Sequence, residues 1–372
     1  MSAPVATASV RVAPGDRFDR RLARFRARFE DEINGYLAAK RTSSTGDPIG
    51  LPMVDAIESL VRAGGKRLRP ALVYHSYRLC GGLDDDRVMP MAMATELLHT
   101  YLLIHDDIMD HAATRRGAPT AHVRFRRFHE GAQWPGDAAH FGRSMAILAG
   151  DLAHTWAAER FRTAIAEGVG PRTRTALDTT FAAMCEEVIH GQYLEMLLPY
   201  EADTSEADVL AVLSMKSGRY SCEQPIELGA RLAGGSEELL EPLVRFGSAV
   251  GEAFQIQDDI LGVFGNPERT GKPVGSDLRE GKYTVLVHHT LRRSDSERRA
   301  RFSKLLGRAN LTEAEVHEAR DIIRSSGGLD VVKAMVETRF GNAASALEDL
   351  PSEAEAYDFF AGLLDYLRDR EA

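Results

Sequence analysis

Apolar residues recur at three- and four-residue intervals along most of the chain. From Phe18 to Ile33, for example, five large apolar residues share one helical face, with arginines between them. The same spacing predicts further long helices, followed by several shorter ones, over 85–110, 141–167, 172–198, 205–233 and 236–263. Runs with the alternation of a β-strand are absent. The pattern therefore predicts an all-α protein, a single large helical bundle with its active-site cavity in the bundle core.

Glycine and proline gather in a few short stretches that predict loops between the helices. They lie at 44–52, 131–136, 168–171 and 265–276. None resembles a domain linker, so we expect one domain over 18–372, preceded by a disordered tail at 1–17. Pro225 lies inside the helix predicted at 205–233 and is expected to kink it.

Composition and charge narrow the class of protein. The chain has 372 residues, of which 44% are hydrophobic and 27% charged, and this balance is typical of a globular protein. A net charge of -9 argues against a nucleic-acid binder. No apolar run approaches the roughly 20 residues of a membrane-spanning helix, and no signal peptide is recognisable. Three scattered cysteines predict neither a disulfide framework nor a zinc site. We expect a cytoplasmic protein.

The apolar segment 96–110 ends in three carboxylates, Asp106, Asp107 and Asp110. Asp106 and Asp110 are four residues apart and share one helical face, where their charges repel. Their place at a helix C-terminus adds a second unfavourable term, because the helix dipole is negative there. Mg²⁺, which prefers oxygen ligands and is often shared with substrate phosphates, would relieve both. The alternative is a solvated acidic helix end.

A second acidic pair, Asp258 and Asp259, interrupts another strongly apolar segment at 251–265. Gly262 stands where a third carboxylate would match Asp110. Both helices are too hydrophobic for a surface position. The two pairs therefore predict two walls of one metal-binding cavity.

Basic residues suited to a diphosphate stand near both acidic motifs. The segment 62–70 places Lys66, Arg67 and Arg69 between a Gly-Gly turn and Pro70, although a solvated basic turn is the alternative. Five further candidates are Arg115, Arg116, Lys216, Lys272 and Lys282. The Gly-rich stretch 265–282 is a candidate mobile lid.

Three other polar residues lie in apolar helical segments. His99 is seven residues before Asp106, on nearly the same helical face, so it is either a ligand-binding group or a hydrogen-bonded core residue. Gln192 and Gln255 have core hydrogen bonds as their simplest explanation.

Together these motifs resemble those of the trans-polyprenyl diphosphate synthases, most closely the bacterial geranylgeranyl diphosphate synthases. The resemblance covers about residues 30–350. It rests on GGKRLRP (64–70), ELLHTYLLIHDDIMDHAATRRGAPTAH (96–122), GQ (191–192), KSGRY (216–220) and FQIQDDILGVFGNPERTGKPVGSDLREGK (254–282). The five motifs in this order are very specific.

The resemblance implies a Mg²⁺-dependent prenyltransferase that joins isopentenyl diphosphate to an allylic diphosphate. Three Mg²⁺ ions would be held by aspartates of the two motifs, here Asp106, Asp107, Asp110, Asp258 and Asp259. The allylic diphosphate would be held by Arg115, Lys216 and Lys272. Isopentenyl diphosphate would be held by Gly65, Lys66, Arg69, His99 and Arg116. The reacting centre or its lid would be lined by Ser217, Gln255 and Lys282. The residues expected to carry catalysis are Asp106, Asp110, Lys216, Asp258 and Lys272.

The resemblance also implies a homodimer and a product length. One aromatic residue five positions before the first motif, with a smaller neighbour, goes with a C20 product in this family. Tyr101 and Leu102 fit that pattern and predict geranylgeranyl diphosphate, with Tyr101 as the cavity floor, unless it is only core packing. Farnesyl and longer-chain products remain alternatives.

Three departures from the family pattern stand out. Gly262 replaces the last aspartate of the second motif, and Ser217 stands where threonine is commoner. The segment 124–142 is longer than the family minimum and is expected to be a surface or interface loop.

Two rival functions remain. A class I terpene cyclase would not need Lys66, Arg69 and Arg116 for a second substrate, and it would carry a different second metal motif. A non-catalytic partner of another synthase is disfavoured by the intact acidic and basic residues.

Overall fold

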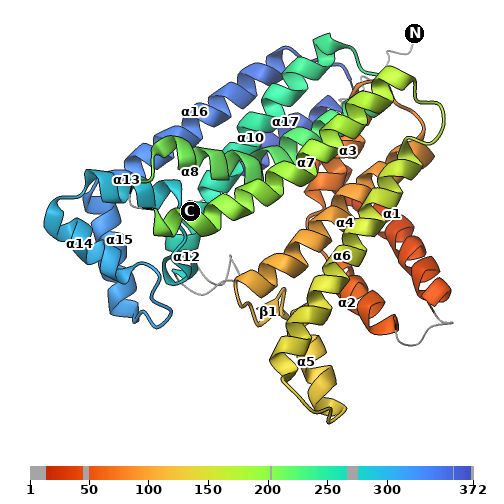
Figure 1. Ribbon diagram of the computed structural model, residues 1–372. Coiled ribbons are helices and arrows are strands. Elements are labelled where there is room, and N and C mark those ends of the chain that lie inside the picture. The colour runs from red at the N-terminus through yellow and green to blue at the C-terminus, as the bar shows by residue number, and fades with distance from the viewer. Residues whose placement is uncertain (1–13, 45–49, 202, 266–274, 355, 370–372) are drawn as a thin grey trace, which may run out of the picture.

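The computed structural model describes residues 14–44, 50–201, 203–265, 275–354 and 356–369, and side chains from Phe18 onward. The described chain is almost entirely helical (Figure 1). Its α-helices are α1 (Pro14–Ser44), α2 (Leu51–Arg62), α3 (Leu68–Leu79), α4 (Asp85–Met109), α5 (Ala121–Gly131), α6 (Ala138–Ala164), α7 (Pro171–Leu197), α8 (Glu206–Val212), α9 (Gln224–Leu232), α10 (Glu237–Phe264), α12 (Ser276–Glu280), α13 (Val285–Arg293), α14 (Ser296–Leu305), α15 (Glu313–Ser325), α16 (Gly328–Glu348) and α17 (Tyr357–Arg368). The other elements are the 3-10 turn η1 (Leu198–Tyr200), the π-helix η2 (Leu213–Glu223) and the strands β1 (Thr114–Arg115) and β2 (Ala118–Pro119). The predicted all-α class is confirmed.

Four of the five long helices lie within a few residues of their predicted positions, as α4, α6, α7 and α10. Local capping explains where two of them begin. Asp84 accepts hydrogen bonds from the backbone N–H groups of Asp86 (3.1 Å) and Arg87 (3.3 Å) at the start of α4. Asp137 caps α6 in the same way.

The helical stretch predicted at 205–233 is present, because helical residues run without a break from Glu206 to Leu232. Its geometry changes along the way, from α8 through the 11-residue π-helix η2 to α9. Pro225 lies in the first turn of α9, directly after η2, and the kink expected there stays a prediction. The departure from α-helical geometry lies earlier, in η2, and π-helical turns are frequent at functional sites.

The prediction of a surface or interface loop over 124–142 is wrong. Helix α5 continues to Gly131 and α6 begins at Ala138, which leaves only residues 132–137 between them. Val123 and Phe125 are buried, and the Trp134 ring packs edge-on against Phe141 (5.6 Å between centroids). These contacts fold the segment into a helical hairpin. A second small difference is the two-residue ladder of β1 and β2, where no strand was expected.

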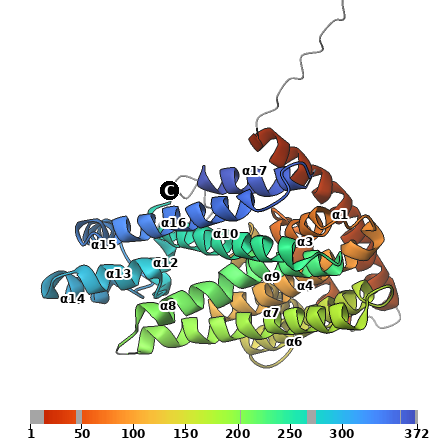
Figure 2. The ribbon, with the colours of Figure 1, turned by 90° about the horizontal axis from the view of Figure 1, so that it is seen from above.

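The two acidic helices lie inside the bundle, as their composition predicted. Helix α4 packs mainly on α6, and α10 packs between η2 and α16. Leu97 and Leu98 of α4 and Ile256 of α10 are fully buried. Figure 2 shows α10 with α16 and α17 on one side of the molecule and α6 with α7 on the other. This packing holds the carboxylates at the ends of α4 and α10 on rigid elements.

Three sequence expectations concern the surroundings of the bundle. The tail expected at 1–17 lies largely outside the described residues, because α1 begins at Pro14. The three cysteines are free. No described helix combines the length and apolar character that crossing a membrane requires.

Candidate active site

The first acidic motif closes the C-terminal end of α4. Asp107 is buried, and burial raises its pKa to about 6. Burial also raises the pKa of Asp110, which caps the helix. Arg115 partly neutralises the negative charge of the motif. Its Nε donates to Asp107 Oδ1 (2.7 Å) and its Nη2 to Asp106 Oδ2 (3.1 Å). Arg115 and the motif therefore form one unit.

A tight hairpin brings Arg115 back onto the motif. Strands β1 and β2 pair Arg115 with Ala118, leaving Arg116 and Gly117 as the two turn residues. Both have positive φ, 52° and 76°, as two-residue hairpin turns require. The turn directs Arg116 toward the start of α3, where its guanidinium lies against Gly65: a Cβ on Gly65 would be 3.1 Å from Arg116 Nη2.

The second acidic motif lies in the last turns of α10. Asp259 is buried, and burial raises its pKa to about 8, although the hydrogen bond from Gln255 Nε2 (2.9 Å) acts in the opposite direction. The charge of Asp277, from α12, adds to the increase. Asp258 is half-buried. Gln255 thus orients a carboxylate of the motif.

Two lysines lie near the carboxylates of the first motif. Lys216 Nζ contacts Glu195 closely and lies 3.7 Å from Asp106 Oδ1. Lys282 Nζ lies 3.8 Å from Asp110 Oδ2 and 2.9 Å from Glu280 Oε2.

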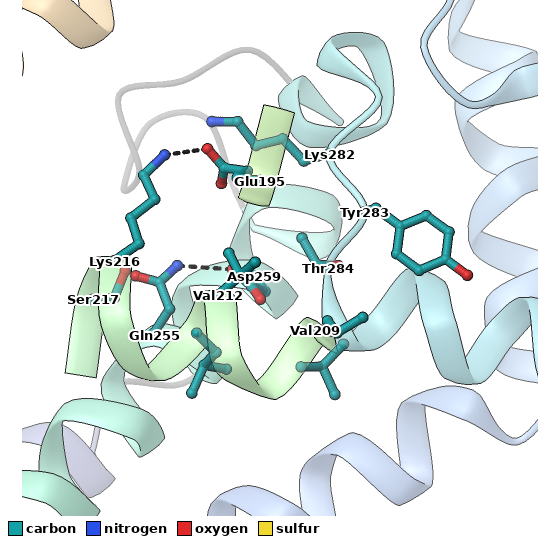
Figure 3. Close-up of a pocket in the computed structure, with 12 residues that line it drawn as sticks. Glu195, Val209, Val212, Lys216, Ser217, Gln255, Asp259, Lys282, Tyr283 and Thr284 are labelled. Carbon is teal, nitrogen blue, oxygen red and sulfur yellow. Dashed lines mark hydrogen bonds and ion pairs between the residues drawn. The ribbon is translucent and has the colours of Figure 1, made fainter. Parts of the chain in front are cut away.

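Lys216 lines one pocket with Asp106 of the first motif and another with Asp259 of the second, so the two motifs lie at adjoining pockets. Burial alone would lower the pKa of Lys282, but the charges of Asp110, Glu195 and Glu280 outweigh it and raise that pKa. Figure 3 shows Lys216, Glu195, Gln255, Asp259 and Lys282 around one small pocket.

The π-helix and a glycine fix the position of Lys216. Lys216 and Ser217 lie within η2, and both line the pockets of this site. Helix α7 approaches η2 so closely at Gly191 that a Cβ there would lie 2.6 Å from the Lys216 backbone nitrogen. Only glycine permits this contact. The GQ motif noted in the sequence therefore has a packing role at its glycine.

A second group of basic residues lies beside the first motif. Arg69 donates to Ser221 Oγ (2.6 Å), and its guanidinium lies 4.6 Å from the centre of the Tyr220 ring. Tyr220 Oη is 2.8 Å from His99 Nδ1. Burial lowers the pKa of His99 far below its usual value, and the charges of Arg69 and Arg116 lower it further. His99 is therefore neutral and hydrogen-bonded within a positively charged pocket.

Lys66 has a different partner from Arg69. Its Nζ donates to Tyr366 Oη of α17 (2.6 Å) and lies 5.0 Å from the centre of that ring. Arg67 is almost completely buried and binds Glu30 and Glu96, so it is a structural residue. Lys272 and half of the expected lid at 265–282 lie outside the described residues.

A larger, mainly apolar cavity of about 390 Å³ extends from the carboxylates along α4 and α7. Tyr101 and Leu102 line it, as do Val188 and Ile189. The Tyr101 ring is half-buried and packs against His105 (4.7 Å) and against His154 of α6 (5.1 Å). Asp106 and Lys216 line the same cavity, so it joins the charged site to an apolar channel.

Glu195 and Tyr220 belong to the site but were not among the predicted residues. Glu195 is 21 residues from its partner Lys216, and Tyr220 is 121 residues from His99. Neither stands at a distinctive spacing from its partner. The position of Glu195 three residues after Gln192, on the same face of α7, is the one sequence signal that could have indicated it.

The donor atoms suit Mg²⁺. In the described chain, no three acidic, histidine or cysteine side chains are grouped as a ready-made metal site. Mg²⁺ does not require one, because it keeps several waters and binds through one or two carboxylates and substrate phosphates. Asp106 and Asp110 offer such carboxylates, and the neighbouring Arg115, Lys216 and Lys282 suit phosphate oxygens.

Several known proteins are similar to this chain. A short chain isoprenyl diphosphate synthase of Methanocaldococcus jannaschii is 37% identical over 274 residues, 74% of this chain and 77% of the relative. A geranylfarnesyl diphosphate synthase of Aeropyrum pernix is 35% identical over 313 residues, 84% of this chain and 92% of the relative. Geranylgeranyl pyrophosphate synthase from Corynebacterium glutamicum, solved with isoprenyl diphosphate and magnesium, has a TM-score of 0.82 at 31% identity, covering 96% of this chain and 98% of that one.

The family profile agrees with these relatives. It matches residues 52–323, a span that begins in α2, contains both acidic motifs and ends in α15. The resemblance inferred from the motifs is confirmed, and the chain belongs to the polyprenyl synthetase family.

Proposed function

We propose that this chain, a prenyltransferase by family, joins isopentenyl diphosphate to an allylic diphosphate and releases geranylgeranyl diphosphate. The observation that carries the proposal is the junction of three features at one point. Lys216 and Lys282 lie near carboxylates of α4 and line a pocket with Asp259 of α10, the arginine pocket lies beside them, and an apolar cavity begins there. A diphosphate with a long hydrocarbon tail fits this combination of charge and apolar surface.

The allylic diphosphate would bind at the acidic end of the cavity. Asp106, Asp110 and Asp258 would hold Mg²⁺, with three ions as the number expected from the family resemblance. Bound Mg²⁺ neutralises diphosphate charge and so makes the diphosphate a better leaving group. Lys216 and Arg115 would donate to the remaining phosphate oxygens once the substrate replaces their carboxylate contacts.

The second diphosphate, that of isopentenyl diphosphate, would bind in the pocket of Arg69 and Arg116. His99 is neutral there, so it offers a hydrogen bond without adding charge. Its bond with Tyr220 fixes the plane of the ring. We expect Lys66 to leave Tyr366 and join this pocket when the substrate binds.

The reaction balances without any group beyond the two substrates. The C1–O bond of the allylic substrate breaks, and the diphosphate leaves with the electron pair. The double bond of isopentenyl diphosphate then attacks C1, and a proton leaves its C2 position to the departing diphosphate. Residues of this chain orient both diphosphates and stabilise the developing charge.

Loss of one carboxylate tests the proposed reaction. Asp106→Asn keeps the size of the side chain but removes a charge that Mg²⁺ requires, so we expect at least a thousandfold loss of radiolabelled isopentenyl incorporation. Asp321→Asn is the control, because Asp321 is an exposed residue on α15 whose carboxylate pairs with Arg324. Wild-type rates in Asp106→Asn, or no incorporation by the wild type with any of the C5, C10 and C15 primers, would refute the proposal.

Product length would be limited by Tyr101. Its ring lies in the cavity wall and is held by His105 and His154. Tyr101→Ala removes that bulk, so we expect products longer than C20 in chromatography of the dephosphorylated alcohols. Tyr200→Ala, at a residue that is 86% exposed, should leave the distribution unchanged. An unchanged C20 product in Tyr101→Ala would show that this ring is not the floor.

We further propose that the enzyme is a homodimer. Exposed apolar side chains support this, with Ile147 and Leu148 on α6 at 45% and 49% exposure. They lie beside His105 of α4, whose Nε2 is 3.1 Å from the Ile147 carbonyl oxygen. His105 lines the apolar cavity together with Tyr193, which is 63% exposed. A second copy would cover these residues and close that side of the cavity.

A further inference from the structure

The second acidic motif lacks its third carboxylate, because Gly262 stands four residues after Asp258. Residues four apart share one face of a helix. Any side chain at 262 would therefore lie beside that of Asp258, near the end of α10. In this chain the position carries no side chain of its own.

Another carboxylate lies in that position. A Cβ built on Gly262 would overlap the carboxylate of Asp277, and even the more distant oxygen, Oδ1, would be only 2.8 Å from it. The Asp277 side chain thus lies directly against the bare backbone of α10. Any other residue at 262 would force it away.

Local structure holds Asp277 there. It lies in the first turn of α12, is 8% exposed, and its Oδ1 is 3.2 Å from the Ser276 hydroxyl. Its charge reaches Asp259, the neighbour of Asp258 on α10. A carboxylate from α12 therefore joins the two on α10 at the face where the third would be.

Building on the Mg²⁺ site of the proposed function, we propose that Asp277 replaces the missing carboxylate of the second motif. Gly262 is the residue that admits it. Asp258 and Asp277 together then serve the Mg²⁺ ions on the α10 side of the cavity. The motif is complete in space, although its third acid comes from a different helix.

The inference predicts that a carboxylate at position 262 of α10 can take over the role of Asp277. Asp277→Asn keeps the shape of the side chain and removes its charge. Gly262→Asp alone overlaps Asp277 and adds a repelling charge. The double variant Gly262→Asp/Asp277→Ala removes the obstacle and supplies the carboxylate from α10. Asp321→Asn is the matched control, because it makes the same change at an exposed aspartate of α15 whose carboxylate pairs with Arg324.

Mg²⁺ binding in the presence of inorganic pyrophosphate, measured by calorimetry on the full chain, gives a readout apart from turnover. We expect Asp277→Asn to bind Mg²⁺ on the order of ten- to a hundredfold more weakly, with an unchanged Tm in the absence of metal. The double variant should recover most of the affinity, and Asp321→Asn should match the wild type.

Two results would overturn the inference. One is wild-type Mg²⁺ affinity in Asp277→Asn. The other is a folded double variant that binds no better than Asp277→Asn. Either result leaves the proposed function standing if the wild type still extends an allylic primer. Absence of pyrophosphate-dependent Mg²⁺ binding in the wild type would refute the metal site and this inference together.

Discussion

Glu195 determines where the ammonium group of Lys216 lies. Without the charge of Glu195, we expect that group to move toward Asp106, 3.7 Å away, and to compete there with Mg²⁺. Glu195→Gln should therefore raise the Mg²⁺ concentration for half-maximal activity about tenfold. Steady-state rates measured against Mg²⁺ concentration test this. Glu186→Gln, on an exposed face of α7, is the control, and an unchanged Mg²⁺ dependence in Glu195→Gln would contradict the role.

His75 makes stability depend on pH. Burial lowers its pKa to about 3, with smaller effects from Arg21 and Arg78, and its ring stacks on Phe359 at 3.9 Å. Below pH 6.5 the His75 ring binds a proton in the unfolded chain but not in the folded chain. The free energy of unfolding therefore falls as the pH falls from 6.5 toward 3, and this contribution is constant above 6.5.

Replacing His75 isolates that contribution. Between pH 6.5 and 5.5, His75→Phe should lose about 1 kcal/mol less than the wild type in urea unfolding. His190→Gln, at an exposed position, should keep the wild-type pH dependence. Equal losses in the wild type and His75→Phe would mean that His75 is protonated in the folded protein.

At the residue scale, spacing was enough to place Asp106 and Asp110 together at the end of α4, because helical periodicity fixes which side chains share a face. It was not enough for Glu195 and Tyr220, whose partners come from other helices. Only the family resemblance distinguished Lys66 from an ordinary surface lysine. The structure shows it bound to Tyr366, a contact between residues 300 positions apart.

At the element scale, the contact between α7 and η2 depends on Gly191. A Cβ there would lie 2.6 Å from the Lys216 nitrogen and 2.9 Å from its Cα, so Gly191→Ala must push η2 away. We expect the free energy of unfolding to fall by about 1–3 kcal/mol. We also expect a lower kcat, because Lys216 is displaced with η2. Chemical unfolding and steady-state kinetics measure both effects.

Gly341 provides the matched control for that substitution. It is exposed in the middle of α16, and nothing lies within 4 Å of a Cβ built there. Gly341→Ala should raise stability by roughly 0.5–1 kcal/mol, because alanine favours the helix. Unchanged stability and kcat in Gly191→Ala would show that α7 and η2 can move apart without loss of stability or activity.

Helix positions followed from the apolar pattern even where several neighbours cover the helix, as in α4 and α10. At 205–233 the pattern predicted the helical stretch but not its division, since the change to π-helical geometry in η2 leaves no mark on the spacing of apolar residues. The loop expected at 124–142 was wrong, because Phe125 is buried in α5 and only residues 132–137 separate α5 from α6. The glycine- and proline-rich stretch 131–136 marked that turn correctly.

At the scale of the whole molecule, the fold class was predictable because long amphipathic helices have few ways to bury their faces besides a bundle. The shape of the cavity was not. It depends on where α4, α7 and η2 approach one another, and such contacts between distant segments are not encoded in local periodicity. The product length inferred from Tyr101 therefore stays a prediction that only the product itself can test.

The proposed dimer links the surface of the molecule to its cavity. If a second copy covers Ile147, Leu148 and Tyr193, a charge placed among them must be buried without a partner or must separate the subunits. Leu148→Glu should therefore give a monomer in sedimentation velocity at micromolar concentration. Leu83→Glu, at a residue 79% exposed beyond α3, should leave the wild-type mass unchanged.

The same substitution tests whether assembly matters for chemistry. A monomer would leave the Tyr193 side of the apolar cavity open to water, which disfavours binding of a long hydrocarbon tail. Leu148→Glu should then release shorter products, because C10 and C15 intermediates are held less tightly, while Leu83→Glu keeps the wild-type distribution. A monomeric Leu148→Glu with unchanged products would show that product length does not depend on dimer formation. A dimeric Leu148→Glu would show that Leu148 does not lie in the dimer interface.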